Sequence, residues 1–277
     1  MESSADRDRP LRWGERGTPS NPDVRLIGIR LTLQDAGMLL EQMAGWIRER
    51  ERKLVLSGNV HAFNLAYELD WLRQLFEEAG AVRMDGAGIR GAAWLLGHEP
   101  PARSTAADFI WLLADFAAKG GIKLFLLGGR EGVAGEAAIR LQQRSPGLSI
   151  VGVHHGYFDT SSASLENTQV VDLVNRAAPD LLVVGMGMPL QELWLRDNWA
   201  NLRVPVAMTG GAVFDYTAGF LRRPPRWMQA IGLEWLGRLL IEPRKLWRRY
   251  LIGIPVFLWR FLRVHGLRLP RRFMRPG

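Results

Sequence analysis

Short apolar runs alternate with segments of helical apolar spacing along this chain, and this alternation most limits what it can fold into. The helical segments are roughly 10–15 residues long, as in chains whose parallel sheet is covered by helices on both faces. The expected strands are residues 25–31, 54–56, 81–84, 123–127, 149–153, 181–184 and 204–208. The sequence therefore predicts an α/β fold with a Rossmann-like, mostly parallel sheet.

Five of these strands stop at a polar or glycine-rich turn. The turns are Ser57–His61, Asp85–Gly88, Gly128–Gly132, Gly185–Glu192 and Gly210–Asp215. The carboxyl ends of parallel strands meet at one edge of a sheet, and ligands of open α/β sheets bind at that edge. We therefore expect the functional site where these five turns meet.

The turn Gly185–Glu192 joins a buried strand to a helix. Its glycines, Gly185 and Gly187, allow a ligand to approach the backbone, and the N–H groups at the start of the helix can face an anion. Pro189 suits the first helical position, which places Gln191 and Glu192 in the first turn, pointing toward the strand ends. The alternative is that the glycines make only a tight connection.

Two further glycine pairs, Gly128–Gly129 and Gly210–Gly211, also follow strands. The first opens a helix and could cradle a phosphate on backbone N–H groups. It matches neither the G-x-G-x-x-G pattern nor a Walker A loop, so its spacing favours a plain strand–helix turn. The second pair leads to Asp215, at the same expected edge.

Asp85 has two interpretations. At the end of a strand its carboxylate can accept a proton from a substrate hydroxyl, or it can cap the helix that follows. Ser57 and Asn59 offer a hydroxyl and an amide that suit the hydroxyl groups of a sugar or nucleotide. His61 could serve the same site or be an ordinary residue of a first helical turn.

Composition argues against a metal or disulfide chemistry. The chain has no cysteine, so it has neither disulfides nor thiolate metal ligands. His154 and His155 are adjacent on an extended segment and would point to opposite faces. The Asp-x-Asp sequence, Asp6–Asp8, lies outside the expected folded part. We expect no metal and no cofactor.

Charge is distributed unevenly along the chain. Residues 222–277 hold 14 Lys and Arg against two acids, a net +12, whereas residues 1–221 carry a net −4. Residues 1–22 are polar and lack the apolar core of a signal peptide, so we expect them to be disordered. The expected parts are a tail at 1–22, an α/β core at 23–222 and a basic helical appendage at 223–277.

The basic appendage mixes tryptophan and leucine with arginine. Its longest apolar run, Tyr250–Trp259, is shorter than the ~20 residues that span a bilayer. A basic, tryptophan-rich amphipathic segment is typical of one that lies in a membrane interface. A solvated helical face and nucleic-acid binding are the alternatives, and the interleaved Trp and Leu favour the membrane.

With these motifs in view, the chain resembles the WecG/TagA/CpsF glycosyltransferases (glycosyltransferase family 26). The resemblance runs from about residue 25 to 255. The matching residues are Ser57-Gly-Asn59, Asp85-Gly86, Leu126-Leu-Gly-Gly129, Gly156-Tyr-Phe158, Gly185–Glu192, Gly210-Gly211, Phe214-Asp215, Gly219, Arg223-Pro224, Gly232–Leu236, Arg238, Glu242-Pro-Arg244 and Arg248-Arg-Tyr250. Ser57 stands where Thr is common, which keeps the hydroxyl, and Arg223-Pro-Pro replaces the more usual Arg-Ala-Pro.

The resemblance implies inverting transfer of a hexosyl unit, often N-acetylmannosamine or its uronate, from a UDP-sugar. The acceptor would be a lipid-linked sugar diphosphate on the cytoplasmic face of the membrane. The proposed general base of such enzymes falls on Asp85, their Thr-x-Asn pocket on Ser57 and Asn59, and their Gln on Gln191.

A leaving diphosphate without a chelated metal needs another source of positive charge, and arginine suits it through bidentate contacts. We expect Arg223, together with Arg238, to move in when the appendage docks on the membrane. The sequence thus predicts a metal-independent, peripheral membrane enzyme of surface or exopolysaccharide assembly, acting on the inner face of the cell membrane. Transfer of another hexose, such as glucose, and a non-catalytic basic protein are the alternatives. The oligomeric state is left open, and nucleic acid is not an expected partner.

Overall fold

The computed structural model describes residues 23–266, and the expected tail at 1–22 lies outside this range. One eight-stranded sheet forms the centre of the molecule, in the order β1-β2-β4-β3-β8-β7-β5-β6. All neighbouring strands are parallel except the antiparallel pair β1 and β2. The strands are β1 (Asp23–Leu26), β2 (Ile29–Thr32), β3 (Lys53–Gly58), β4 (Ala81–Met84), β5 (Leu124–Gly128), β6 (Ile150–His154), β7 (Leu181–Gly185) and β8 (Val206–Thr209). The predicted α/β fold with a mostly parallel sheet is confirmed.

The prediction of a single strand at residues 25–31 is wrong. The segment is a hairpin whose two turn residues, Ile27 and Gly28, have φ of 48° and 81°. Two adjacent residues with positive φ form the tight turn that suits the twist of paired strands. The alternating pattern on either side hid this turn, because a hairpin and one long strand share the same period of two.

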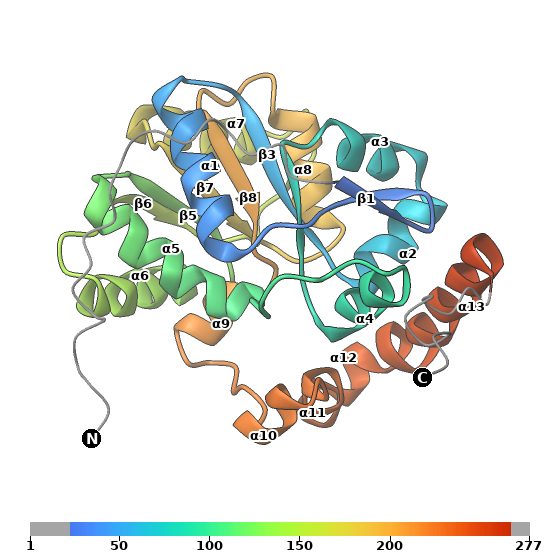
Figure 1. Ribbon diagram of the computed structural model, residues 1–277. Coiled ribbons are helices and arrows are strands. Elements are labelled where there is room, and N and C mark those ends of the chain that lie inside the picture. The colour runs from blue at the N-terminus through green and yellow to red at the C-terminus, as the bar shows by residue number, and fades with distance from the viewer. Residues whose placement is uncertain (1–22, 267–277) are drawn as a thin grey trace.

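Helices cover both faces of the sheet (Figure 1). Alternate residues of the five central strands, β3, β4, β5, β7 and β8, enter two separate apolar clusters, as Leu181 and Val183 do on one face and Leu182 and Val184 on the other. The helices before the appendage are α1 (Ala36–Arg48), α2 (Val60–Glu68), α3 (Asp70–Glu78), α4 (Ala87–Leu95), α5 (Ala106–Gly120), α6 (Val133–Arg144), α7 (Leu165–Ala177), α8 (Leu190–Asn198) and α9 (Val213–Thr217). The first cluster holds residues of α1, α5, α6 and α9, and the second holds residues of α2, α3, α4, α7 and α8.

The connections after the neighbouring strands β3 and β8 leave on opposite faces of the sheet. Residues of α2, which follows β3, belong to one apolar cluster, and residues of α9, which follows β8, belong to the other. In an open α/β sheet, such a reversal opens a crevice at the carboxyl ends of the strands. This rule places the crevice at the carboxyl ends of β3 and β8, beside Ser57 and Thr209, at the centre of the sheet.

The C-terminal helices run past the carboxyl edge of the sheet, below β8 in Figure 1. They are α10 (Arg226–Ala230), α11 (Glu234–Ile241), α12 (Pro243–Trp247), the π-helical turn η1 (Arg248–Ile252) and α13 (Gly253–His265). The last helix packs on α2, where Phe257 meets Phe63 edge to face with ring centroids 6.4 Å apart. Arg260 donates to the backbone and side-chain oxygens of Asn64. These contacts hold the basic segment against the core.

Candidate active site

Asp85 lies directly after β4, where its side chain is partly exposed. Its backbone N–H donates to Gly58 O at 3.0 Å, which ties it to the end of β3. The N-cap of α4 is Gly86, with φ of 89°, so Asp85 does not cap this helix. The carboxylate is therefore left for other partners at the crevice.

Three arginines interact with Asp85: Arg83 from the preceding strand, and two from the appendage. A guanidinium nitrogen of Arg83, on β4, lies 4.0 Å from its Oδ1. On α11, burial lowers the pKa of Arg238, but Tyr250, Tyr216 and Asp85 outweigh this and raise it. On η1, burial lowers the pKa of Arg249, and Tyr250 and Asp85 oppose that change. The carboxyl edge of β4 thus holds one carboxylate in a cationic environment.

Ser57 is buried and fully engaged within the sheet. Its hydroxyl donates to Thr209 O at 3.0 Å and accepts from Arg83 at 3.2 Å, and its N–H donates to Thr209 Oγ1 at 2.9 Å. Asn59 is the N-cap of α2 and accepts from Ala62 N at 3.0 Å. The structure brings both residues to the crevice, but it uses their oxygen atoms to hold the backbone there.

His61 stands in the first turn of α2 and faces the appendage. Burial, and after it the positive charge of Arg249, lower its pKa to about 4. The imidazole is therefore neutral near pH 7. A neutral ring can donate or accept one hydrogen bond without adding charge to the site.

The glycine turns are pressed against one another. A Cβ on Gly128 would lie 2.3 Å from Gly185 O, and one on Gly185 would lie 2.8 Å from the ring of Phe214. Gly129 N donates to Gly185 O at 3.1 Å, and Gly210 N donates to Val184 O at 2.8 Å. Close backbone packing therefore requires Gly128 and Gly185, whatever ligand the turns also bind.

Gln191 links the turns that follow β7 and β8. Pro189 is the N-cap of α8 and not the first helical residue that was predicted, because the helix begins at Leu190. Gln191 and Glu192 still occupy the first helical turn, and both are fully buried. Gln191 Oε1 accepts from Gly187 N at 3.3 Å and from Gly211 N at 2.9 Å, and its Nε2 donates to Glu192 Oε1 at 2.7 Å. Within residues 23–266, the second carboxyl oxygen of Glu192 has no hydrogen-bond partner. Burial raises the pKa of Glu192 to about 7.

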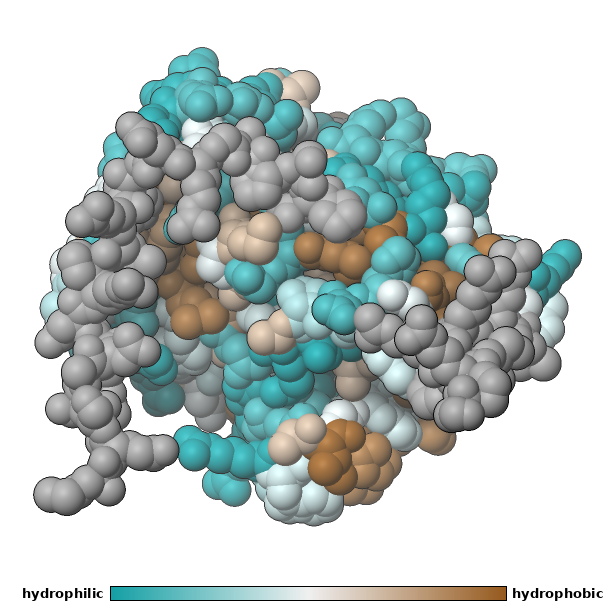
Figure 2. All heavy atoms as spheres, in the orientation of Figure 1, coloured by the Kyte–Doolittle hydropathy of each residue, from teal (hydrophilic) through white to brown (hydrophobic). Residues whose placement is uncertain are grey.

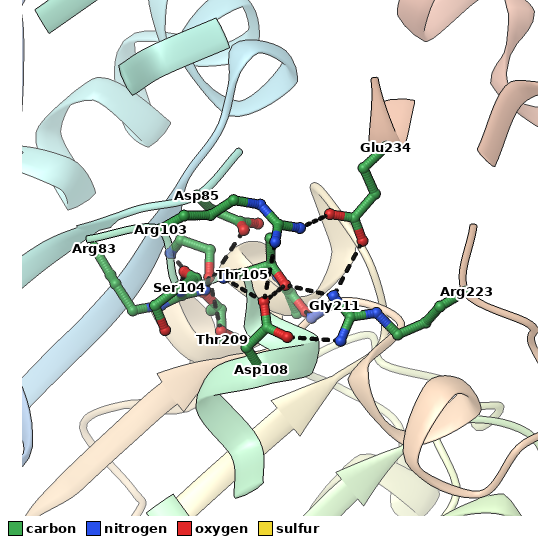
Figure 3. A network of polar contacts seen from close by, with 12 residues as sticks. Arg83, Asp85, Arg103, Ser104, Thr105, Asp108, Thr209, Gly211, Arg223 and Glu234 are labelled. Carbon is green, nitrogen blue, oxygen red and sulfur yellow. Dashed lines mark hydrogen bonds and ion pairs between the residues drawn. The ribbon is translucent and has the colours of Figure 1, made fainter. Parts of the chain in front are cut away.

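Arg223 belongs to an ion-pair cluster that joins the appendage to the core, which we call the anchor cluster: Arg103, Asp108, Arg223 and Glu234. Arg223 donates to Asp108 at 2.6 Å and lies 3.4 Å from Glu234, and Arg103 pairs with both acids. Figure 3 shows the cluster together with Asp85 and Arg83. Asp108 and Glu234 thus already engage the guanidinium of Arg223, which was expected to contact the leaving diphosphate.

The remaining expected residues lie at the same edge or beside it. Asp215, on α9, is half-buried, and burial raises its pKa although Lys245 opposes this. The guanidinium of Arg238 lies over the ring of Tyr216, 5.4 Å from its centroid. His154, the last residue of β6, and His155 have ring centroids 4.4 Å apart, so the prediction that they point to opposite faces is wrong. No group of three His, Asp or Glu side chains within residues 23–266 is arranged to hold a metal ion.

Sequence reasoning missed Arg83, Thr209 and Arg249. Arg83 is the one charged residue in the four-residue strand β4 and stands two positions before Asp85. Because residues two apart in a strand share a face, that spacing was a usable signal. Arg249 lay in a run of basic residues, where the sequence did not show which cation faces inward.

Comparisons with known proteins identify the family of this chain. Residues 24–271 match the model of the glycosyl transferase WecG/TagA/CpsF family. An N-acetylglucosaminyldiphosphoundecaprenol N-acetyl-beta-D-mannosaminyltransferase from Staphylococcus aureus (strain NCTC 8325 / PS 47) is 30% identical over 206 residues, 74% of this chain and 78% of that protein. A protein of the same name from strain MW2 is 29% identical over the same shares. A non-catalytic basic protein would not show such a match. The chain therefore belongs to the WecG/TagA/CpsF family and is a hexosyltransferase.

Proposed function

We propose that this enzyme transfers an N-acetylmannosaminyl-type unit from a UDP-sugar to a polyprenyl-diphosphate-linked sugar, with inversion at the transferred carbon. The names of the relatives supply both classes: an N-acetyl-beta-D-mannosaminyl group and an N-acetylglucosaminyl diphosphoundecaprenol acceptor. The product would serve surface or exopolysaccharide assembly. The observation that carries the proposal is Asp85, a partly exposed carboxylate among three arginines at the carboxyl edge of the sheet.

An inverting transfer needs one general base. Asp85 accepts the proton of the acceptor hydroxyl while that oxygen attacks the sugar, and UDP leaves from the opposite face. We assign contacts with sugar hydroxyl groups to the amide nitrogen of Asn59 and to neutral His61.

The leaving diphosphate gains negative charge in the transition state, and positive groups must meet it. We assign this role to Arg238 and Arg249, which interact with Asp85 and with Tyr250. Arg223 is held by Asp108 and Glu234, so it fixes the segment that carries those two arginines. This supply of guanidinium groups supports a transfer that does not depend on a metal ion.

The appendage is the proposed membrane contact, on the inner face of the cell membrane. Among residues 23–266, no helix is both long and apolar enough to cross a bilayer. Figure 2 shows an apolar patch at the lower edge of the molecule, where Figure 1 draws α10 and α11. Within residues 223–266 of the appendage, the large exposed apolar side chains are Trp227, Ile231, Leu240, Ile241, Trp247, Leu251, Ile252, Leu258, Trp259, Leu262 and Val264.

Basic side chains accompany these apolar groups. Arg226, Arg244, Lys245, Arg248 and Arg263 are exposed on the same helices. Each basic residue near an anionic leaflet contributes about 1 kcal/mol, and tryptophan suits the interface because one end of its ring is polar. Docking there would bring the crevice to the lipid-linked acceptor.

The test is acceptor-dependent UDP release by the full chain in EDTA, with a panel of UDP-sugars and a lipid-diphosphate-linked N-acetylglucosamine. Turnover in EDTA that Asp85→Asn abolishes supports the proposal and identifies the donor. A UDP-glucose preference would establish the alternative hexose. A strict requirement for a divalent ion would overturn the arginine assignment, and full activity of a form truncated near Arg222 would remove the appendage from the chemistry.

A further inference from the structure

A charged side chain in the middle of a sheet is costly unless it is paired and hydrogen-bonded. Arg83 is such a residue: all four residues of β4 are buried, and Arg83 is 5% exposed. Burial lowers its pKa, and the nearby Asp85 and Asp108 oppose this. An apolar residue would fill this strand position at lower cost, so the guanidinium needs another explanation.

The partners of Arg83 fix its guanidinium in one plane. One terminal nitrogen donates to Ser104 O at 2.7 Å, and the other donates to Ser57 Oγ at 3.2 Å. The guanidinium carbon lies 5.2 Å from the ring centroid of Phe109, on α5. A forked, planar group can satisfy all these contacts at once, which the single ammonium of lysine cannot do.

The same nitrogen that contacts Ser57 lies 4.0 Å from Asp85 Oδ1. Arg83 and Asp85 are two residues apart, so their side chains belong on one face of the sheet. Ser57 is the register partner of Arg83 on β3 and is in turn held by Thr209 of β8. A chain of contacts therefore runs from β8 through Ser57 and Arg83 to the carboxylate.

We propose that Arg83, held by Ser57, is a positioning residue that orients the carboxylate of Asp85 toward the acceptor hydroxyl. The inference rests on the proposed role of Asp85 as base. It gives Ser57 a different part from that of a sugar-binding hydroxyl, because its oxygen is engaged by Arg83 and Thr209. It also explains why an arginine occupies a buried strand.

The experiment compares kcat and KM of Arg83→Met, Arg83→Lys, Ser57→Ala and Ser57→Thr in the full chain. A misplaced catalytic group can cost on the order of 100-fold in rate, so we expect Arg83→Met to lower kcat by about that factor while KM for the donor stays within about twofold. Arg83→Lys keeps the charge but loses the fork, so its kcat should lie between those of wild type and Arg83→Met. Ser57→Ala should lower kcat by about tenfold, and Ser57→Thr should restore it.

Coupling separates positioning from a general loss of stability. If Ser57 acts through Arg83, Ser57→Ala has little further effect on kcat when Arg83→Met is already present. Additive losses of kcat would overturn the proposal, as would kcat of Arg83→Met within about threefold of wild type. Should Arg83→Met not fold, the pair Ser57→Ala and Ser57→Thr decides by the same kcat criterion.

A matched control is Arg30→Met. Arg30 also donates to backbone carbonyls, those of Ala79 and Gly80, but it does so at the opposite end of β4. The kcat of Arg30→Met should equal that of wild type, and the variant should lose only free energy of unfolding. The turnover of the wild-type enzyme tests the proposed function. If wild type is active but the variants keep its kcat, only the positioning role of Arg83 is refuted.

Discussion

Glu192 makes the stability of the fold depend on pH in a direction that can be measured. Its pKa is raised from 4.5 to about 7 in the folded protein, because the side chain is fully buried. Between these values the unfolded chain releases the proton while the folded protein keeps it. For this group, stability is therefore greatest below pH 4.5 and is lost as the pH rises toward 7. At about 1.4 kcal/mol per pH unit, the loss amounts to about 3 kcal/mol.

Glu192→Gln removes this titration while keeping a carbonyl oxygen that can accept from Gln191. We compare the free energy of unfolding in urea at pH 5 and at pH 8. The difference between Glu192→Gln and wild type should shift in favour of the variant by about 2.5 kcal/mol from pH 5 to pH 8. The new amide group of Glu192→Gln has an N–H without a partner, which would lower the free energy of unfolding of the variant by the same amount at both pH values. The quantity to compare is therefore the change in this free energy between pH 5 and pH 8. Glu41→Gln, on the exposed surface of α1, is the control and should match wild type at both. A Glu192→Gln effect of the same size at pH 5 and pH 8 would refute the reasoning.

Three further outcomes follow from the packing and the appendage. Gly128→Ala places a methyl group 2.3 Å from Gly185 O in a backbone with φ of 148°. It should therefore lower the free energy of unfolding by more than about 2 kcal/mol. The control Gly135→Ala, at a helical position with no atom near the new methyl group, should not. Arg223→Ala breaks the anchor cluster, so limited proteolysis should cut the appendage faster than in Arg222→Ala; equal rates would count against the anchor. Trp247→Ala and Trp259→Ala remove exposed rings, so each should weaken the affinity for anionic vesicles by roughly tenfold in a sedimentation assay. Raised salt should weaken the affinity further. Unchanged binding of the double variant would place the membrane contact elsewhere.

The sheet could be predicted because its signal is local. Runs such as Leu181–Val184 are buried on both faces and bounded by glycine, which is sufficient to identify a parallel strand. The order of the strands was beyond this reasoning, since pairings such as β3 with β8 join residues about 150 positions apart. The hairpin at Ile27 and Gly28 was missed because its period matches that of one strand.

The site was predictable in position but not in its contacts. Asp85 and Gln191 do lie at the carboxyl edge, because a residue that follows a parallel strand must lie there. Which partners they meet depends on tertiary packing: the sequence could not show that two glycine N–H groups converge on Gln191, or that Asp108 and Glu234 engage Arg223. The proposed assignment of the diphosphate to Arg249 in place of Arg223 also needed the fold of the appendage.

The strand order also has a consequence for synthesis on the ribosome. The last strand made, β8, lies between β3 and β7 near the middle of the sheet. Until residue 209 has left the exit tunnel, the nascent chain holds two half-sheets with exposed edges, and such edges invite pairing with other chains. Ser57 gains its Thr209 partners at that same moment. Both the sheet and the crevice are therefore completed late in translation, when a chaperone that shields open strand edges would be of most use.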